Sequence, residues 1–391
     1  MARIGIFGGS FDPPHIGHIQ SARYAMEQLR LDRLIVIPTG IPPHKAANVS
    51  AAACRKQMLE LAVQDLECVE VSDLEIRREG ISYTYETVEH IHLLYPRADL
   101  YLLMGSDMFL SFDHWKYPER ILRRASLAVF CRGEKGESAA IREKKQLMEA
   151  CGHRIHLIEC PAVEISSTQL RRLLAFGCEG ELLPLGVADY IRENDLYHVH
   201  ASWKNLPMEE LEQVVVSLLK PNRVAHVLGC RDAAVALAKR WGVDETDAAR
   251  AALLHDITKA LDGPLQLTLC SCYGKVLDDF SQRYPKTLHA LTGSLVAERI
   301  FGENPAVVAA IESHTTGKAA MNMLEKIIYV ADYMEPNRDF PGVERLRELA
   351  FSNMDEALKL GLEMTLQHLK RQGAEVSPAS REALEYLRVT V

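Results

Sequence analysis

The sequence predicts a two-domain protein whose first half is an α/β fold and whose second half is all helical. Short apolar runs alternate with helical periodicity up to about residue 200, and the strand signal disappears beyond about residue 205. A length of 391 residues also favours two domains over one, because a domain typically holds roughly 150 residues. We expect a first domain over 1–197, a linker over 198–206 and a second domain over 207–391.

Six apolar runs in the first half predict β-strands, and the segments between them predict helices, for example over 16–29, 51–62 and 85–94. Strands separated by helices need right-handed crossover connections, which give a parallel sheet covered by helices on both faces. Ligands of such sheets bind at the carboxyl ends of the strands. The strands are predicted at 3–7, 34–37, 69–72, 100–104, 127–130 and 155–158.

The second half predicts helices only, because apolar residues recur there at helical spacing. Pro221 stands at an expected first turn, and Gly242, Gly302 and Gly373 follow expected helix ends. This domain should therefore be a bundle of helices. They are predicted at 208–219, 222–241, 245–260, 289–301, 305–313, 323–334, 355–371 and 377–387.

Composition narrows the class of protein. The net charge of −8 is shared equally by the two halves, so we expect neither a basic arm for nucleic acid nor a nucleic-acid partner. Nine cysteines form an odd set without a repeated CxxC motif, which is typical of free thiols in a reducing cytoplasm. The chain starts directly with a predicted strand, and its longest apolar runs are far shorter than the ~18 residues that span a bilayer. We expect a cytoplasmic protein without a membrane partner, and a homo-oligomer remains open.

The first predicted strand continues into the string GGSFDPPHIGH over residues 8–18. Two adjacent glycines let a ligand approach the backbone closely, and the N-terminus of the following helix attracts anions. His15 and His18 lie three residues apart in the first helical turn, so both can reach one phosphate group. Taken alone, the glycine pair could be only a turn, and the histidine pair could be a surface pair or half of a metal site.

The complete string closely resembles the first signature of the HxGH nucleotidyltransferases, which join a nucleotide to a phosphate acceptor and release pyrophosphate. A second string, ISSTQLR over 165–171, resembles that superfamily's second signature, although alone it is an ordinary helix cap followed by a helix. Four further segments, residues 12–15, 41–45, 82–84 and 105–107, extend this resemblance. With them, residues 1–197 resemble the bacterial nicotinate-nucleotide adenylyltransferases. The resemblance implies a Rossmann-like sheet. Pantetheine-phosphate adenylyltransferases and cytidylyltransferases are the alternatives on this fold, and the Pro13-Pro14-His15 form favours the nicotinate enzymes.

The implied reaction is attack by the phosphate of nicotinate mononucleotide on the α-phosphorus of ATP, which gives deamido-NAD and pyrophosphate. The nucleophile is already an anion, so catalysis needs positioning and charge neutralisation, with Mg²⁺ accompanying ATP. From their pattern alone, Trp115 could equally be a core residue and Lys45 a solvated one. The resemblance implies catalytic roles for His18, His15, Lys45 and Arg171, ATP binding by Gly8, Gly9, Ser10, Phe11, His15, His18, Ser167 and Arg171, and nicotinate nucleotide binding by Lys45, Tyr83, Thr84, Asp107 and Trp115.

Six side chains of the helical half predict a metal site. They follow the order H, HD, H, H, D at intervals of 29, 33, 25 and 18 residues, which places the ligands on different helices. Histidine and carboxylate bind Zn, Fe, Mn or Co, and six such groups with one bridging aspartate suffice for two ions. Both aspartates interrupt apolar runs, where an unpaired carboxylate would cost several kcal/mol. The six are His226, His255, Asp256, His289, His314 and Asp332.

The strings LHDITK over 254–259, HTTG over 314–317 and IIYVADYMEPNR over 327–338 resemble the HD superfamily of metal-dependent phosphohydrolases. They look most similar to its members that split diadenosine tetraphosphate symmetrically into two ADP. The resemblance implies an HD-domain helical bundle, a catalytic role for Asp256, phosphate contacts from Lys259 and Arg338, and two transition-metal ions. We expect iron, with manganese, cobalt or zinc as alternatives, and metal-bound water of lowered pKa as the nucleophile.

Together these resemblances imply a bifunctional enzyme whose partners are small nucleotides: ATP, nicotinate mononucleotide and diadenosine tetraphosphate. Two alternatives concern the helical domain. It could act on other nucleotides, or it could be a binding module without turnover. Its complete set of six predicted ligands argues against the second alternative.

Overall fold

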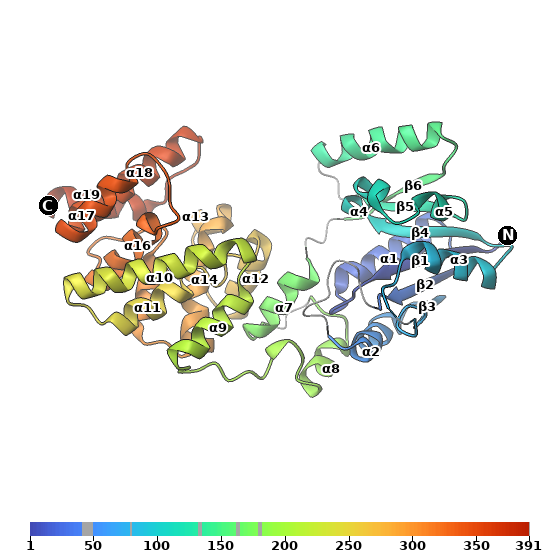
Figure 1. The fold of residues 1–391 in the computed structure, drawn as a ribbon, viewed down its shortest axis with the longest axis horizontal. Coiled ribbons are helices and arrows are strands. Elements are labelled where there is room, and N and C mark those ends of the chain that lie inside the picture. Colours follow the sequence, from blue (N-terminus) through green and yellow to red (C-terminus); the bar gives the residue numbers. More distant parts are fainter. Residues whose placement is uncertain (41–49, 79, 132–134, 162–164, 179–181, 391) are drawn as a thin grey trace. The chain divides into compact units, whose positions relative to one another are not determined.

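The structure is a computed structural model that describes residues 1–391 apart from 41–49, 79, 132–134, 162–164, 179–181 and 391. The chain separates into two compact units (Figure 1). The first consists of Met1–Leu174 with Glu179–Val199, and the second of Ala175–Cys178 with His200–Val391. Residues Ala175–Cys178 are packed within the second unit, although the first unit continues after them in the sequence. Phe176 is fully buried, and its carbonyl accepts a hydrogen bond from the Tyr273 hydroxyl at 2.5 Å.

The first unit contains a six-stranded sheet in the order β3-β2-β1-β4-β5-β6. All five neighbouring pairs are parallel, which confirms the predicted α/β class. Strand order reverses between β1 and β4, and parallel sheets bind their ligands beyond the carboxyl ends at such a switch point. The strands are β1 (Arg3–Gly9), β2 (Arg33–Pro38), β3 (Val69–Val71), β4 (Asp99–Gly105), β5 (Ala125–Cys131) and β6 (Ile155–Glu159).

Helices cover both faces of this sheet, as Figure 1 shows. Successive residues of β2 alternate between two apolar clusters: Ile35 and Ile37 join Val88 and Ile91 of α3, whereas Leu34 and Val36 join residues of α1 and α2. This alternation follows from the two-residue period of a strand, so both faces of β2 are buried. The helices are α1 (Ile16–Gln28), α2 (Ala52–Val63), α3 (Thr84–Leu94), α4 (Ser106–Leu110), α5 (Pro118–Leu122), α6 (Lys135–Ala150), α7 (Ser167–Ala175) and α8 (Val187–Glu193), with short helical turns at Phe112–His114 and Leu196–His198.

The described residues of the second unit form helices and connecting turns without a strand, which confirms the predicted all-helical class. Helix α10 packs against α11 and α16, while α15 packs against α11, α14 and α16. The helices are α9 (Met208–Leu218), α10 (Pro221–Trp241), α11 (Glu245–Leu254), α12 (Gly263–Cys272), α13 (Asp279–Arg283), α14 (His289–Val296), α15 (Pro305–Ser313), α16 (Met323–Met334), α17 (Val343–Ser352), α18 (Met354–Arg371) and α19 (Pro378–Thr390).

Two of the predicted helices differ from the structure. The helix predicted over 245–260 ends at Leu254, because the chain continues in tight turns in which Ile257 and Lys259 bond to carbonyls three residues earlier. The helix predicted over 289–301 changes to a wider π-helical turn over Ala297–Phe301. Helices α12, α13 and α17 were not predicted.

The nine cysteines are all free thiols, in agreement with the expectation from composition. Among the described residues, no helix combines the length and the apolar character needed to cross a membrane.

Candidate functional site

The GGSFDPPHIGH segment connects β1 to α1. His15 precedes the helix, and its N–H donates to His18 Nδ1 at 3.1 Å. The two imidazole rings lie with their centroids 3.7 Å apart. A neutral imidazole that accepts at Nδ1 carries its proton on Nε2, so His18 has the tautomer that can donate to a phosphate oxygen.

Phe11 and Gly9 hold this histidine in place. The Phe11 ring is 1% exposed and packs edge-on against His18 at 5.0 Å between centroids. A side chain at Gly9 would place its Cβ 3.0 Å from the Phe11 ring, which explains the glycine. The Phe11 ring is thus a core group, so Phe11 is suited to contact a ligand only through its backbone.

The two signature segments meet although about 150 residues separate them. Ser167 donates its hydroxyl to the Pro13 carbonyl at 3.0 Å, and Arg171 donates to the Asp12 carbonyl at 2.6 Å. Arg171 also forms an ion pair with the Asp12 carboxylate at 3.5 Å. The start of α7 therefore lies beside the loop that carries His15 and His18.

Two residues that sequence reasoning missed, the buried Arg55 and the half-buried Tyr197, support the same loop. Tyr197 donates its hydroxyl to Asp12 Oδ1 at 2.6 Å, and burial together with this carboxylate raises the pKa of Tyr197. Arg55 of α2 is 2% exposed and donates to the carbonyls of the residues that directly follow β1 and β2, Ser10 at 3.0 Å and Thr39 at 2.8 Å. No sequence signal identifies them, because their partners are distant in sequence and mostly backbone atoms.

Two of the residues predicted to bind the nicotinate nucleotide lie at the starts of helices. Thr84 begins α3, and Asp107 lies in the first turn of α4, directly after β4. Tyr83 is half-buried, with the Lys116 ammonium 3.8 Å from its ring centre. Trp115 is half-buried against Phe112 of the core, 5.3 Å between ring centres. Lys45 lies outside the described residues.

In the second unit, the six predicted ligands converge. His226 lies on α10, His255 and Asp256 follow the end of α11, His289 begins α14, His314 follows α15, and Asp332 lies on α16. The four histidines and Asp256 are buried, whereas Asp332 is half-buried.

Asp256 lies between two pairs of histidines. Its Oδ2 faces the Nε2 atoms of His226 at 3.8 Å and His255 at 3.6 Å. Its Oδ1 faces the Nε2 atoms of His289 at 3.6 Å and His314 at 3.8 Å. A carboxylate that presents one oxygen to each pair can bridge two cations.

The histidine rings are oriented by their other nitrogen. Nδ1 of His255, His289 and His314 lies 2.6, 2.9 and 2.7 Å from the carbonyl three residues earlier. An Nδ1–H that donates to a carbonyl leaves Nε2 with a lone pair, the form that ligates metals. Burial also lowers the pKa of His255 and His289 well below the ordinary value and that of His314 to about 4, which keeps these rings neutral. The Nε2 lone pairs of these histidines and the carboxylate oxygens of Asp256 are together suited to bind divalent cations.

His226 is oriented by a carboxylate that is not among the six predicted ligands. Its Nδ1 lies 3.1 Å from Oε1 of Glu335, which is 1% exposed. Gly229 makes room for this contact, because a Cβ there would lie 2.5 Å from Glu335 Oε2. His226 Nε2 is thereby directed to Asp332 Oδ1 at 3.2 Å.

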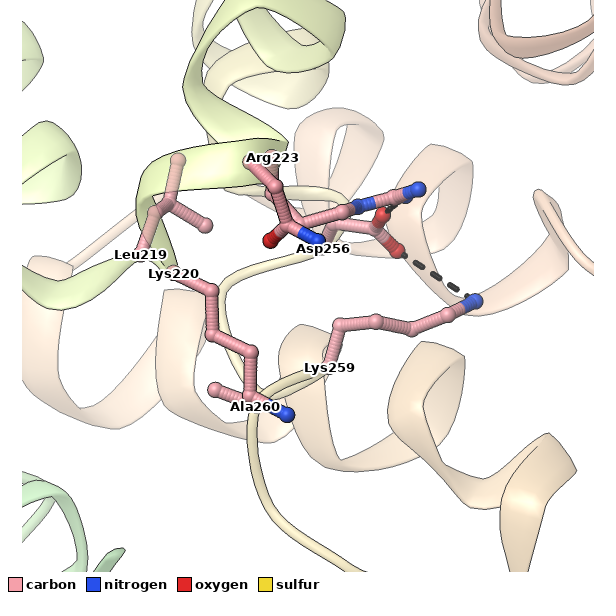
Figure 2. Close-up of a pocket in the computed structure, with 7 residues that line it drawn as sticks. Leu219, Lys220, Arg223, Asp256, Lys259 and Ala260 are labelled. Carbon is pink, nitrogen blue, oxygen red and sulfur yellow. Dashed lines mark ion pairs between the residues drawn. The ribbon is translucent and has the colours of Figure 1, made fainter. Parts of the chain in front are cut away.

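Basic side chains surround these ligands. Lys259 Nζ lies 3.7 Å from Asp256 Oδ1 and 2.7 Å from His289 Nε2, and Arg338 forms an ion pair with Asp332 at 2.6 Å. Arg223, which was not predicted, forms an ion pair with Asp256. Figure 2 shows Arg223 and Lys259 converging on Asp256. Together with Lys220, these residues line a pocket of about 220 Å³. A pocket with three basic side chains favours a phosphate ligand.

Comparisons with known proteins match the two halves of the chain to two different families. A cytidylyltransferase-like family matches residues 6–173, and the HD domain family matches residues 223–337. A Clostridium tetani protein named "Probable nicotinate-nucleotide adenylyltransferase" is 35% identical over 199 residues, which cover 50% of this chain and 100% of the relative. A Desulfitobacterium hafniense protein of the same name is 39% identical over 199 residues, covering 50% of this chain and 96% of the relative.

One solved structure, from Clostridium acetobutylicum, is described as a predicted HD superfamily hydrolase involved in NAD metabolism. It is 35% identical and covers 48% of this chain and 99% of that chain, with a TM-score of 0.46. The relatives of the first group are matched over nearly their full length. The chain therefore belongs, over about half of its length, to the nicotinate-nucleotide adenylyltransferase family, and it carries an HD domain in its second half.

Proposed function

We propose that the first unit transfers the adenylyl group of ATP to nicotinate mononucleotide and releases deamido-NAD and pyrophosphate. One observation carries this proposal: Ser167 and Arg171 of the second signature bind the backbone of residues 12 and 13, directly before the two histidines. The names of the family relatives support the choice of substrates.

In this mechanism the chain positions two anions and neutralises their charge. His18 donates from Nε2 to the α-phosphate as its charge grows, while His15, Lys45 and Arg171 contact the triphosphate. The backbone of residues 8–11 supplies further contacts to ATP. Bound together with ATP, Mg²⁺ would supply positive charge that helps to neutralise the phosphates. No protein nucleophile is needed, because the attacking phosphate is already an anion.

The acceptor preference tests this assignment. We expect kcat/KM for nicotinate mononucleotide to exceed that for nicotinamide mononucleotide about ten- to a hundred-fold, since a hydrogen bond to a charged group contributes about 1.5–3 kcal/mol. The carboxylate would gain from the N-terminus of α3 and from Lys116 beside Tyr83. Initial rates of pyrophosphate release with each nucleotide measure the preference. Equal or reversed use of the two acceptors would refute the assignment.

For the second unit, we propose hydrolysis of dinucleoside polyphosphates, with diadenosine tetraphosphate giving two ADP. The observation that carries it is Asp256 between two histidine pairs, beside a pocket lined by Lys220, Arg223 and Lys259. His226, His255 and Asp332 would hold one ion, His289 and His314 the other, and Asp256 would bridge them. Bound transition metals, iron by our expectation, supply Lewis acidity and a water of lowered pKa.

The basic residues of this unit would bind the polyphosphate. Lys259 and Arg223 lie at Asp256, and Arg338 lies at Asp332, so each can contact a phosphate oxygen close to the ligand cluster. A long chain of negative charge needs such neutralisation, which favours a polyphosphate over an uncharged substrate. Other nucleotides remain the alternative substrates for this pocket.

Product analysis with and without metal tests this activity. We expect two ADP from each diadenosine tetraphosphate. Dialysis against a chelator should abolish this product, because the proposed reaction depends on the metal ions that the six side chains would hold. Adenylyl transfer should recover when Mg²⁺ is added back to the same sample. Nucleoside triphosphates and cyclic nucleotides serve as comparison substrates. Faster hydrolysis of these compounds would reassign the substrate, and fewer than one tightly bound metal per chain would favour a binding module.

A further inference from the structure

We propose that Cys230 is a thiolate ligand of the metal ion held by His226, His255 and Asp332, so that this ion binds through nitrogen, oxygen and sulfur. The proposal rests on the metal site described above and adds a donor that the six predicted ligands do not include. It also makes the two ion positions chemically unequal.

The position of Cys230 follows from the spacing on α10. It stands four residues after His226, so both side chains lie on the same face of the helix, one turn apart. The thiol is 1% exposed, and its Sγ lies 3.7 Å from His226 Nε2. Donor atoms of His226, Cys230, His255 and Asp332 all lie within 4.8 Å of one another.

These separations fit a single ion. A nitrogen at about 2.0–2.1 Å and a sulfur at about 2.3 Å from one ion, at a near-tetrahedral angle to each other, lie about 3.5 Å apart. The observed distances are 3.7 Å from Cys230 Sγ to His226 Nε2 and 3.2 Å from His226 Nε2 to Asp332 Oδ1. Two of the donor separations therefore already match those around one cation, and all four donor atoms lie within 4.8 Å of one another.

A second observation points to a ligand at this place. His255 Nε2 belongs to the same group, its residue is 1% exposed, and the atom has no hydrogen-bond partner among the described residues. A buried imidazole nitrogen without a partner is costly unless a cation binds it. The ring of His226 is independently fixed by Glu335, whose approach depends on Gly229.

The alternative is that Cys230 is only a small buried apolar group, as most free cysteines are. Its contact with the backbone is weak, a separation of 3.9 Å between Sγ and the Ala331 carbonyl. The two alternatives differ in metal preference. A thiolate favours Zn²⁺, Co²⁺ or Cd²⁺ over Mg²⁺ or Mn²⁺, whereas a site of nitrogen and oxygen alone shows less of this preference.

Cobalt titration of the metal-free, full-length protein tests the proposal. We expect visible ligand-field absorption together with a near-ultraviolet band from thiolate-to-cobalt charge transfer. Cys230→Ala should remove the near-ultraviolet band, keep the visible bands and weaken cobalt binding at least ten-fold. Cys270→Ala is the matched control, because Cys270 is also 1% exposed in the second unit but lies outside both donor groups; it should behave like the wild type.

A measurement without any variant gives the same answer. X-ray absorption at the metal edge of the wild-type protein should detect a sulfur scatterer at about 2.3 Å. Cobalt uptake without charge transfer, or an unchanged band in Cys230→Ala, would overturn the thiolate ligand and leave the proposed hydrolase site standing. Failure to take up any cobalt would overturn the metal site itself, and the cysteine ligand with it.

Discussion

Replacing His18 with alanine is expected to lower kcat/KM for adenylyl transfer roughly a hundred- to a thousand-fold, the loss typical of removing one transition-state donor. The His15 N–H donates to His18 Nδ1, which leaves the ring proton on Nε2 for the α-phosphate. Pyrophosphate release measures the effect. Release of ADP from diadenosine tetraphosphate should be unchanged in the same sample, because we propose that reaction for the second unit.

Two further variants separate catalysis from folding. His18→Asn retains a side-chain acceptor for the His15 N–H and so preserves the start of α1, but it removes the imidazole. We expect it to be as inactive as His18→Ala. His90→Ala removes an exposed histidine of α3 and should retain full activity. Near-normal transfer by His18→Asn would mean that His18 acts only by positioning the helix.

The second large effect is expected for Asp256→Asn. This change preserves the shape of the side chain but removes the charge that lies between four imidazoles, so the affinity for both ions should collapse. Hydrolysis of diadenosine tetraphosphate should fall by roughly three orders of magnitude or more, since hydroxide generation near neutral pH depends on bound metal. The measurements are ADP release and metal content per chain.

Adenylyl transfer reports whether this variant is folded in its first unit, and far-ultraviolet circular dichroism reports on the helices of the second. Asp232→Asn, an exposed carboxylate on α10, is the matched control and should retain metal and hydrolysis. Full metal content with normal hydrolysis in Asp256→Asn would exclude the bridging role. Full metal content with no hydrolysis would instead make Asp256 a group that acts on the nucleophile.

Local pattern was sufficient for the architecture. The six strands were predicted because each is a short apolar run between turn residues, and buried parallel strands need little else. The helix predicted over 245–260 was wrong beyond Leu254 because its apolar residues continue at helical spacing even though the backbone turns. A buried stretch remains apolar in either conformation, so periodicity could not find this end.

For the two sites, some residues could be predicted from the sequence and others could not. The two motifs that resemble known families pointed to His18 and Asp256, whose proposed chemistry requires particular residue types. The supporting residues Arg55, Tyr197 and Glu335 could not be predicted, because an arginine, a tyrosine or a glutamate in a helix or junction is ordinary until its distant partner is known. The proposed ligand Cys230 was not predicted either, although it stands four residues after the predicted ligand His226 on the same helix.

The assignment of residues 175–178 to the second unit has a practical consequence for anyone wishing to produce the halves separately. A polypeptide cut once near residue 200 would lose Phe176 from its helical half and leave the Tyr273 hydroxyl without its acceptor. The front piece would keep Phe176, which is fully buried in the intact chain and groups with the second unit. Because residues 175–178 of the second unit stand between two segments of the first, no single cleavage of the chain separates two complete units.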